Sequence, residues 1–270
     1  MSIDVLQEKI RKTKNPSMID LALRVSDLPA HLLEEEGSAC AAYGRFCREL
    51  IGQLKGLVPA VRVSFTAFAI LGPDGLRELQ SVLSAASSAG YYVALEAPYI
   101  LSPMMAQATA EAVWGKNAIY PCDGLIVSAY AGSDVIKQFI PYVKDQKKDL
   151  FPVVRTSNKT APEIQDLMTG SRLVHAAAAD LINRFGADFV KLFPITNLGV
   201  EYVKAVKAPL SHIKLLGVGG INEKNINDYL LAGLSGIGIG ANIANNKLIA
   251  ENAFTEITKL AKFFTEGIKK

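Results

Sequence analysis

Ile213-Lys-Leu-Leu-Gly217-Val-Gly219-Gly220 and Gly236-Ile-Gly238-Ile-Gly240 are two short apolar runs, and the amphipathic segment Ile221–Ala232 separates them. Short apolar runs of this kind are typical of strands buried on both faces of a parallel sheet. Parallel neighbours need a crossover connection, and an amphipathic helix supplies it. The segment therefore predicts a strand–helix–strand unit, with glycine-rich turns where each strand ends.

The same alternation extends over the rest of the chain. Eight such units favour a closed TIM (β/α)8 barrel, because closure leaves no exposed sheet edge. An open, doubly wound α/β sheet is the alternative. No Pro/Gly/Ser-rich linker divides the sequence, so we expect one domain over residues 1–270. The predicted strands are Ser17–Leu23, Ala60–Phe68, Tyr91–Ala97, Gly124–Tyr130, Phe151–Thr156, Phe189–Phe193, Ile213–Val218 and Gly236–Ile239.

The bulk composition excludes several classes of protein. The 270 residues are 50% hydrophobic and 20% charged, with a net charge of +3 from dispersed residues, so we expect no nucleic-acid partner. No run approaches the ~20 apolar residues that span a bilayer, and we expect no membrane partner. Three cysteines and three scattered histidines lack metal-ligand spacing. We therefore expect no metal or other cofactor, and a cytoplasmic location.

The two glycine-rich turns predict a phosphate site. In (β/α)8 barrels the chemistry lies at the carboxyl ends of the strands, and the loops after strands seven and eight commonly hold phosphate. Glycine lets backbone N–H groups approach an anion, and a helix N-terminus adds partial positive charge. Gly219, Gly220, Gly238 and Gly240 are the candidate phosphate-binding residues. The alternative is that these glycines only permit tight turns.

A lysine stands among the apolar residues of predicted strand six, in Gly186-Ala-Asp-Phe-Val-Lys191-Leu-Phe-Pro194. Such a lysine either extends along the surface or points into the barrel. Inside the barrel, partial desolvation would lower its pKa and make the amine nucleophilic enough to form a Schiff base. The strand pattern alone leaves both possibilities open.

The segment Gly186–Gly199 resembles the lysine signature of the 2-keto-3-deoxy-6-phosphogluconate / 4-hydroxy-2-oxoglutarate (KDPG/KHG) aldolases. The likeness continues through Gly219-Gly220-Ile221 to Gly240. It implies that Lys191 forms an imine with pyruvate or its adducts and that the paired glycine loops hold the substrate phosphate. The chain departs from that family at Ile195, where the family has a small residue, and at Ala241, where it usually has a serine.

The first two thirds resemble a different family, the bacterial type 2 orotidine 5′-phosphate decarboxylases. The resemblance lies in Gly124–Asp134 and Phe151–Asn158, and in the layout of the N-terminal strands. That family uses an alternating Lys/Asp network with an Asp-x-Lys-x-x-Asp tract. The corresponding tract is Glu96–Leu101, in which Pro98 replaces the lysine and Leu101 the second aspartate. Arg62 aligns with the strand-two lysine and Ala22 with the strand-one aspartate, so we do not expect orotidylate decarboxylase activity itself.

Three further charged residues complete the candidate site. Glu96, at the end of strand three, is either the carboxylate that moves protons for Lys191 or a structural ion-pair partner of Arg62 or Arg155. Arg155, at a strand end, either binds a carboxylate or phosphate bidentately or braces its loop. Arg62 is a candidate substrate-binding residue that lies earlier in its strand, where a structural role is the alternative.

The leading hypothesis is a carbon–carbon lyase, a class I Schiff-base aldolase, acting on a phosphorylated 2-oxo acid of the KDPG type. Its catalytic residues would be Lys191 and Glu96, and its partner a small phosphorylated substrate. One alternative is a divergent lyase or isomerase of the orotidylate decarboxylase superfamily, acting on a phosphosugar or nucleotide. Another is a barrel that binds a phosphate ligand without catalysis. A homo-oligomer is expected by analogy with related barrels.

Overall fold

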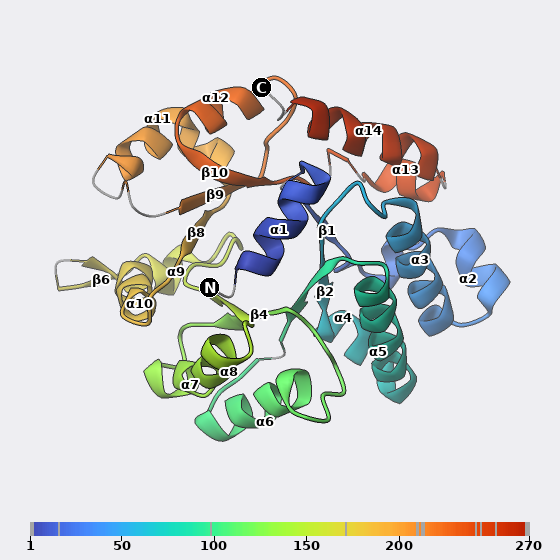
Figure 1. Ribbon diagram of the computed structural model, residues 1–270, viewed down its shortest axis with the longest axis horizontal. Coiled ribbons are helices and arrows are strands. Elements are labelled where there is room, and N and C mark those ends of the chain that lie inside the picture. The colour runs from blue at the N-terminus through green and yellow to red at the C-terminus, as the bar shows by residue number, and fades with distance from the viewer. Residues whose placement is uncertain are drawn as a thin grey trace.

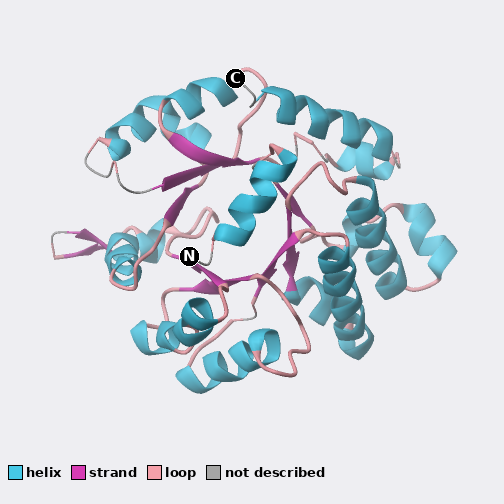
Figure 2. Cartoon of the chain, viewed as in Figure 1, coloured by secondary structure: helices cyan, strands magenta, loops and turns pink. Residues whose placement is uncertain are grey.

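Eight parallel strands surround the middle of the molecule, and helices form a layer outside them (Figures 1 and 2). The computed structural model describes residues 3–15, 17–97, 99–170, 172–208, 211, 214–240, 242–243, 245–251 and 253–267. The predicted α/β barrel of the (β/α)8 type is confirmed. Its strands are β1 (Met18–Asp20), β2 (Ala60–Ser64), β3 (Tyr92–Glu96), β4 (Gly124–Ser128), β5 (Asp149–Val153), β8 (Phe189–Leu192), β9 (Lys214–Val218) and β10 (Leu234–Gly238).

Helices connect consecutive strands, as parallel pairing requires. The clearest example is α5, which buries Leu79, Val82 and Leu83 on one side, as its amphipathic pattern predicts. The helices are α1 (Asp4–Thr13), α2 (Ala30–Glu36), α3 (Ala39–Gln53), α4 (Phe65–Ala69), α5 (Gly72–Ser88), α6 (Pro103–Trp114), α7 (Ser133–Lys137), α8 (Ile140–Asp145), α9 (Pro162–Gln165), α10 (Val174–Asn183), α11 (Ile195–Lys207), α12 (Ile226–Leu231), α13 (Asn246–Ala250) and α14 (Phe254–Gly267), with a 3-10 turn η1 (Val25–Asp27).

The hydrogen-bond ladder of the barrel forms two arcs. One arc has the order β1-β2-β3-β4-β5 and the other the order β10-β9-β8. Within the described residues, no ladder joins β5 to β8 or β10 to β1. The connection between the arcs carries a small antiparallel hairpin of β6 (Met168–Thr169) and β7 (Arg172–Leu173). The eight strands thus encircle the barrel with a seam on either side of the three-stranded arc.

Several predicted boundaries were wrong for identifiable reasons. The strand predicted at Ala60–Phe68 ends at Ser64, because Phe65 begins α4 and Phe68 packs its ring edge-on against Tyr43, with centroids 4.7 Å apart. Strand β5 begins at Asp149, which is buried and accepts a 2.6 Å hydrogen bond from the Tyr92 hydroxyl. An apolar pattern does not reveal a strand that starts on a buried aspartate.

The segment predicted as a helix over Ile221–Ala232 becomes helical only at Ile226. Gly219 and Gly220 adopt φ values of +91° and +72°, which suit glycine and end the strand abruptly. The Asn222 amide N–H then donates to the Asn225 side-chain oxygen at 2.8 Å, which makes a turn before the helix. The loop after β9 is therefore longer than the periodicity suggests.

Helix α1 closes the amino end of the barrel (Figure 1). Its Val5 and Leu6 pack on an interior cluster built around Tyr92. Lys9 Nζ donates to the Gly90 carbonyl at 2.8 Å, and Gly90 lies two residues before β3 begins at Tyr92. With the amino end covered, ligands reach the interior from the carboxyl ends of the strands.

The main hydrophobic core lies between the outer faces of the strands and the helices. Along β2 and β3, the side chains in that core alternate with side chains that face the barrel interior. In the part of the chain that the structure describes, every helix is too short or too polar to cross a membrane.

Candidate active site

Strand alternation places three charged residues inside the barrel at its carboxyl end. On β2, Arg62 shares a face with Ala60, which belongs to the interior cluster. On β3, Glu96 shares a face with Tyr92 and Ala94 of the same cluster. Asp20 ends β1 directly opposite Arg62 in the ladder. Three adjacent strands therefore bring these side chains together.

Arg62 is ion-paired with both neighbours. Its Nη1 lies 2.6 Å from Asp20 Oδ2, and its Nη2 lies 2.8 Å from Glu96 Oε2. Burial alone would lower the pKa of Arg62, but the two carboxylates outweigh it and hold that pKa above its ordinary value. The side chains of Asp20 and Glu96 remain 48% and 37% exposed, so both carboxylates are open to a ligand.

Lys191 lies on β8, across the barrel from this cluster. Partial desolvation lowers the pKa of Lys191 although its side chain remains exposed to solvent, and the positive charge of Arg62 lowers it further, while Asp20 and Glu96 act in the opposite direction. Its Nζ lies 5.4 Å from the centroid of the Phe193 ring. Within the described residues, its amine makes no ion pair with a carboxylate inside 4.0 Å. The predicted inward orientation fits these interactions, and the amine is not locked to a carboxylate.

Neighbouring atoms leave no room for a side chain at most of the candidate phosphate-binding glycines. A Cβ on Gly219 would lie 2.7 Å from the Phe193 ring, and one on Gly220 would lie 2.2 Å from the Thr196 side chain. On β10, a Cβ on Gly238 would lie 2.7 Å from Val218, whereas one on Gly240 would meet nothing within 4 Å. Close packing therefore accounts for the first three glycines, and Gly240 borders open space.

The loops after β9 and β10 are bound to each other. Asn242 Nδ2 donates to the Ile221 carbonyl at 2.6 Å. The amide N–H groups of Gly219, Gly220 and Gly240 donate no hydrogen bond within the described part of the chain. Backbone amides that point out of two adjoining loops at the carboxyl end of a barrel are suited to an anion, and they would act here without the N-terminus of α12, which begins only at Ile226. Ala241, whose position bears on this site, lies outside the described residues.

Arg155 is separate from this group. Its guanidinium makes a bidentate pair with Asp166, with both N–O distances 2.9 Å. Asp166 also lies 3.0 Å from His175 Nδ1, at the start of α10. Of its two predicted roles, the structure provides the contacts for bracing the loop after β5, and within the described residues Arg155 makes no hydrogen bond or ion pair with Arg62 or Glu96.

Asp20 is the site residue that the sequence reasoning missed. It lies within the predicted strand Ser17–Leu23, and its alternation with Met18 was the available signal. Ala22, the residue aligned with the strand-one aspartate of the decarboxylases, lies beyond β1 and donates its amide N–H to Asp20 Oδ1 at 3.0 Å. Pro98, which replaces their lysine, lies outside the described residues. Among described residues, no group of three His, Cys, Asp or Glu side chains is placed to hold a metal.

Comparison with known proteins gives the same two resemblances as the sequence. The family described as "KDPG and KHG aldolase" matches residues 157–260. Orotidine 5′-phosphate decarboxylase of Rhodopirellula baltica is 30% identical over 186 residues, which cover 66% of this chain and 62% of that protein. The 2-dehydro-3-deoxy-6-phosphogalactonate aldolase of Escherichia coli is 31% identical over 85 residues, 31% of this chain and 42% of that protein.

A solved structure confirms the fold over the full length. A putative orotidine 5′-phosphate decarboxylase from Streptomyces avermitilis superimposes with a TM-score of 0.72 at 18% identity, covering 100% of this chain and 96% of that one. The chain is therefore a barrel that resembles orotidine 5′-phosphate decarboxylases over most of its length and KDPG and KHG aldolases over residues 157–260.

Proposed function

We propose that this protein is a class I aldolase that cleaves a phosphorylated 2-oxo acid through an imine on Lys191. The observation that carries the proposal is the setting of this amine. It faces two carboxylates inside the barrel, its pKa is lowered, and it forms no ion pair within 4.0 Å among the described residues. An amine of this kind is neutral more often near pH 7 than a surface lysine, and only the neutral amine attacks a carbonyl.

The chemistry follows from that amine. Lys191 adds to the C2 carbonyl and water is lost, giving a protonated imine. When the C4 hydroxyl gives up its proton, the C3–C4 bond breaks and its electron pair passes to the imine, so an aldehyde leaves and an enamine remains. Protonation and hydrolysis of the enamine release pyruvate. Each of these steps moves a proton, and a positioned carboxylate is a common carrier.

Glu96 is our candidate for that carrier. It ends β3 with its side chain 37% exposed, and Arg62 Nη2, 2.8 Å from its Oε2, holds the carboxylate in position. Asp20 supplies a second acceptor on the other side of Arg62. Because Arg62 is already paired with two carboxylates, we assign it to positioning them. We assign the substrate phosphate to the amides of Gly219, Gly220 and Gly240, which donate no hydrogen bond to the residues that the structure describes.

The test is reduction with borohydride in the presence of pyruvate, followed by mass spectrometry of the intact protein and its peptides. We expect one added pyruvate-derived group, located on Lys191. The folded protein would contradict the proposal if it gave no adduct at Lys191 with pyruvate or with a range of other 2-oxo acids.

Lys214 provides a matched control. It lies on the neighbouring strand β9 with its Nζ 5.0 Å from the Phe189 ring centroid, much as Lys191 lies over Phe193. Within the described residues, Lys214 makes no hydrogen bond or ion pair with Asp20, Arg62 or Glu96. Lys191→Met should abolish the adduct, and Lys214→Met should retain it.

A second candidate function is a divergent lyase or isomerase of the orotidylate decarboxylase superfamily, acting on a phosphosugar or nucleotide. Alternating charges on three adjacent strands, Asp20, Arg62 and Glu96, favour it. Uridine monophosphate binding that is lost in Arg155→Ala would support this candidate. If Arg155→Ala still binds uridine monophosphate, Arg155 is not part of the binding site, which would agree with its pairing to Asp166.

A further inference from the structure

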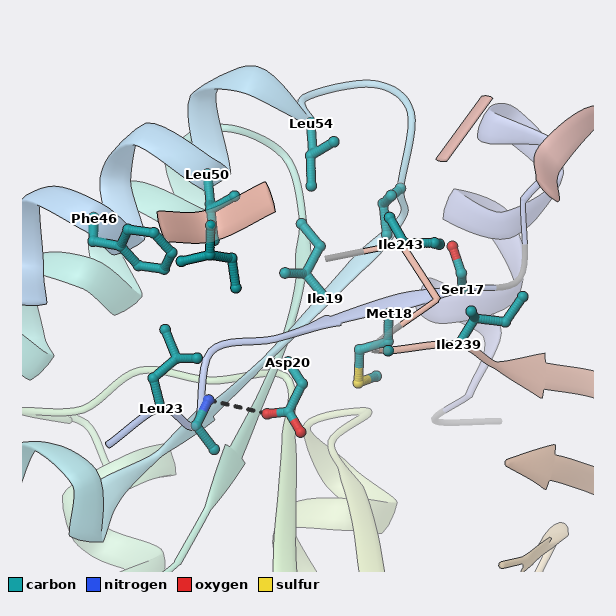
Figure 3. A pocket seen from close by; sticks show the side chains of 14 residues that line it. Ser17, Met18, Ile19, Asp20, Leu23, Phe46, Leu50, Leu54, Ile239 and Ile243 are labelled. Atoms are coloured by element: carbon teal, nitrogen blue, oxygen red, sulfur yellow. Dashed lines mark hydrogen bonds between the residues drawn. The ribbon is translucent and has the colours of Figure 1, made fainter. Parts of the chain in front are cut away.

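A cavity of about 230 Å³ adjoins the candidate site in the seam between β1 and β10. Figure 3 shows its walls: Leu50 of α3 and Leu54 just after it on one side, Ile19 of β1 below them, and Ile239 and Ile243 from the chain after β10 on the other. The cavity exists because no ladder joins β1 to β10 in the described residues, so the two strands stand apart while α3 covers the seam.

The walls offer apolar contact and few free polar groups. Ser17 lines the cavity, but its hydroxyl already donates to Asn15 Oδ1 at 2.6 Å. Asp20 also lines it, and its two oxygens accept from Ala22 and Arg62. A buried water needs two to four polar partners, so an apolar group suits this space better than water does.

The cavity reaches the anion-binding loop. Gly240 is one of its lining residues, its amide N–H is free within the described residues, and no atom lies within 4 Å of the place where a Cβ would stand. An anion held at this amide therefore has open space next to it that leads to an apolar wall. The volume exceeds the ~150 Å³ of an engineered cavity that binds benzene, so an aryl ring or a short alkyl chain has room.

We propose that the seam cavity is a subsite for the apolar part of an organic phosphate, with the phosphate at the Gly240 loop and an alkyl chain of about four carbons, or one aryl ring, between α3 and Ile243. The proposal rests on the anion-binding part of the proposed function. A phosphate monoester bound in this way has its only organic group in the seam cavity, so it is a ligand that competes with the 2-oxo acid substrate for the Gly240 loop and does not react at Lys191.

The test is a chain-length series measured by titration calorimetry: inorganic phosphate, methyl phosphate, butyl phosphate and phenyl phosphate. Each methylene that enters the cavity should tighten binding about fourfold, so butyl phosphate should bind roughly 60-fold more tightly than methyl phosphate. Equal affinity for methyl and butyl phosphate would overturn the proposal. The series uses the unmodified protein, so it does not depend on any variant folding.

Two variants locate the effect. Leu50→Phe places a larger side chain in the seam cavity, and it should remove the dependence on chain length while inorganic phosphate still binds. Val113→Phe is the matched control, because Val113 lines a second apolar cavity of about 230 Å³ under α6, away from the glycine loops. Chain-length dependence that survives Leu50→Phe would overturn the proposal, since the apolar group would then be bound elsewhere.

The outcome is separable from that of the aldolase proposal. Lys191→Met should keep the chain-length dependence, because Lys191 does not line the cavity. A pyruvate adduct on Lys191, together with equal affinities for phosphates of different chain length, would overturn the subsite alone. A steep series without any adduct would support the subsite and contradict the imine. Failure of every phosphate to bind at millimolar concentration would overturn the subsite and the anion loop together.

Discussion

The Arg62 guanidinium lies 2.8 Å from the Glu96 carboxylate, so the residue predicted to move protons is held by a charged partner on the neighbouring strand. The same guanidinium contacts Asp20 on its other side, at 2.6 Å. One cation thus sets the position of two carboxylates and also lowers the pKa of the lysine across the barrel.

Replacing Arg62 should therefore change the pKa of Lys191 through charge, with no direct contact between the two side chains. In Arg62→Gln, loss of the positive charge raises the pKa of Lys191, and the pH midpoint of pyruvate trapping moves upward. Turnover near pH 7 should fall about tenfold for each pKa unit. Arg62→Lys keeps the charge and should retain a midpoint close to that of the unmodified protein. A midpoint that does not move in Arg62→Gln would contradict the proposed coupling.

Glu96→Gln should separate proton transfer from imine formation. Because the Glu96 carboxylate raises the pKa of Lys191, its loss lowers that pKa, and trapping should persist with its midpoint at lower pH. Turnover should fall by a factor of about 10²–10⁴, the usual contribution of a positioned acid or base. If trapping and turnover instead fell together while the fold was retained, Glu96 would have only a structural role.

Gly220→Ala should destabilise the protein, and Gly240→Ala should not. Gly220 has φ +72°, and its Cβ would lie 2.2 Å from Thr196, so alanine there should cost at least about 1 kcal/mol. That corresponds to a Tm about 2–4 °C lower in a protein of this size class. Gly240 has open space at its Cβ and no positive φ. Thermal unfolding of the pair measures the difference, and equal Tm values would contradict the packing argument.

Asp166→Asn should make the Tm of the protein depend less on pH in the acid range. The Arg155 guanidinium holds the pKa of Asp166 below its usual 3.8, with a smaller contribution from His175. A carboxyl with a depressed folded pKa stabilises the fold above that usual value, and the stabilisation is lost as the pH falls through the folded pKa. The Tm difference between the two proteins should be present at pH 7 and should shrink toward pH 3. A Tm difference that stayed the same from pH 7 to pH 3 would show that the Arg155–Asp166 pair is not its cause.

The strand order could be predicted because the strands are short, apolar and separated by amphipathic segments. All eight appear at or within a few residues of their predicted positions. The errors arose where tertiary contacts override local pattern: Phe65 enters a helix instead of extending β2, and buried Asp149 begins β5 through its bond with Tyr92.

The site was predicted less completely than the fold. Lys191 and Glu96 stand at strand ends, where a sequence can point to them, but the pairing of Arg62 with Asp20 depends on the register between β1 and β2. The separation of Arg155 from the site depends on Asp166, a residue on the loop after α9 that has no sequence signal of its own. Contacts between distant segments set both outcomes.

The two arcs of the hydrogen-bond ladder carry different parts of the candidate site. The carboxylates and their arginine belong to β1–β5, whereas the amine and the glycine loops belong to β8–β10, and the aldolase likeness begins at residue 157, just after β5 ends. Neither arc alone holds all the groups that the proposed reaction uses. In that reaction turnover requires both arcs to stay in contact, so a low concentration of denaturant should abolish activity before the helices unfold.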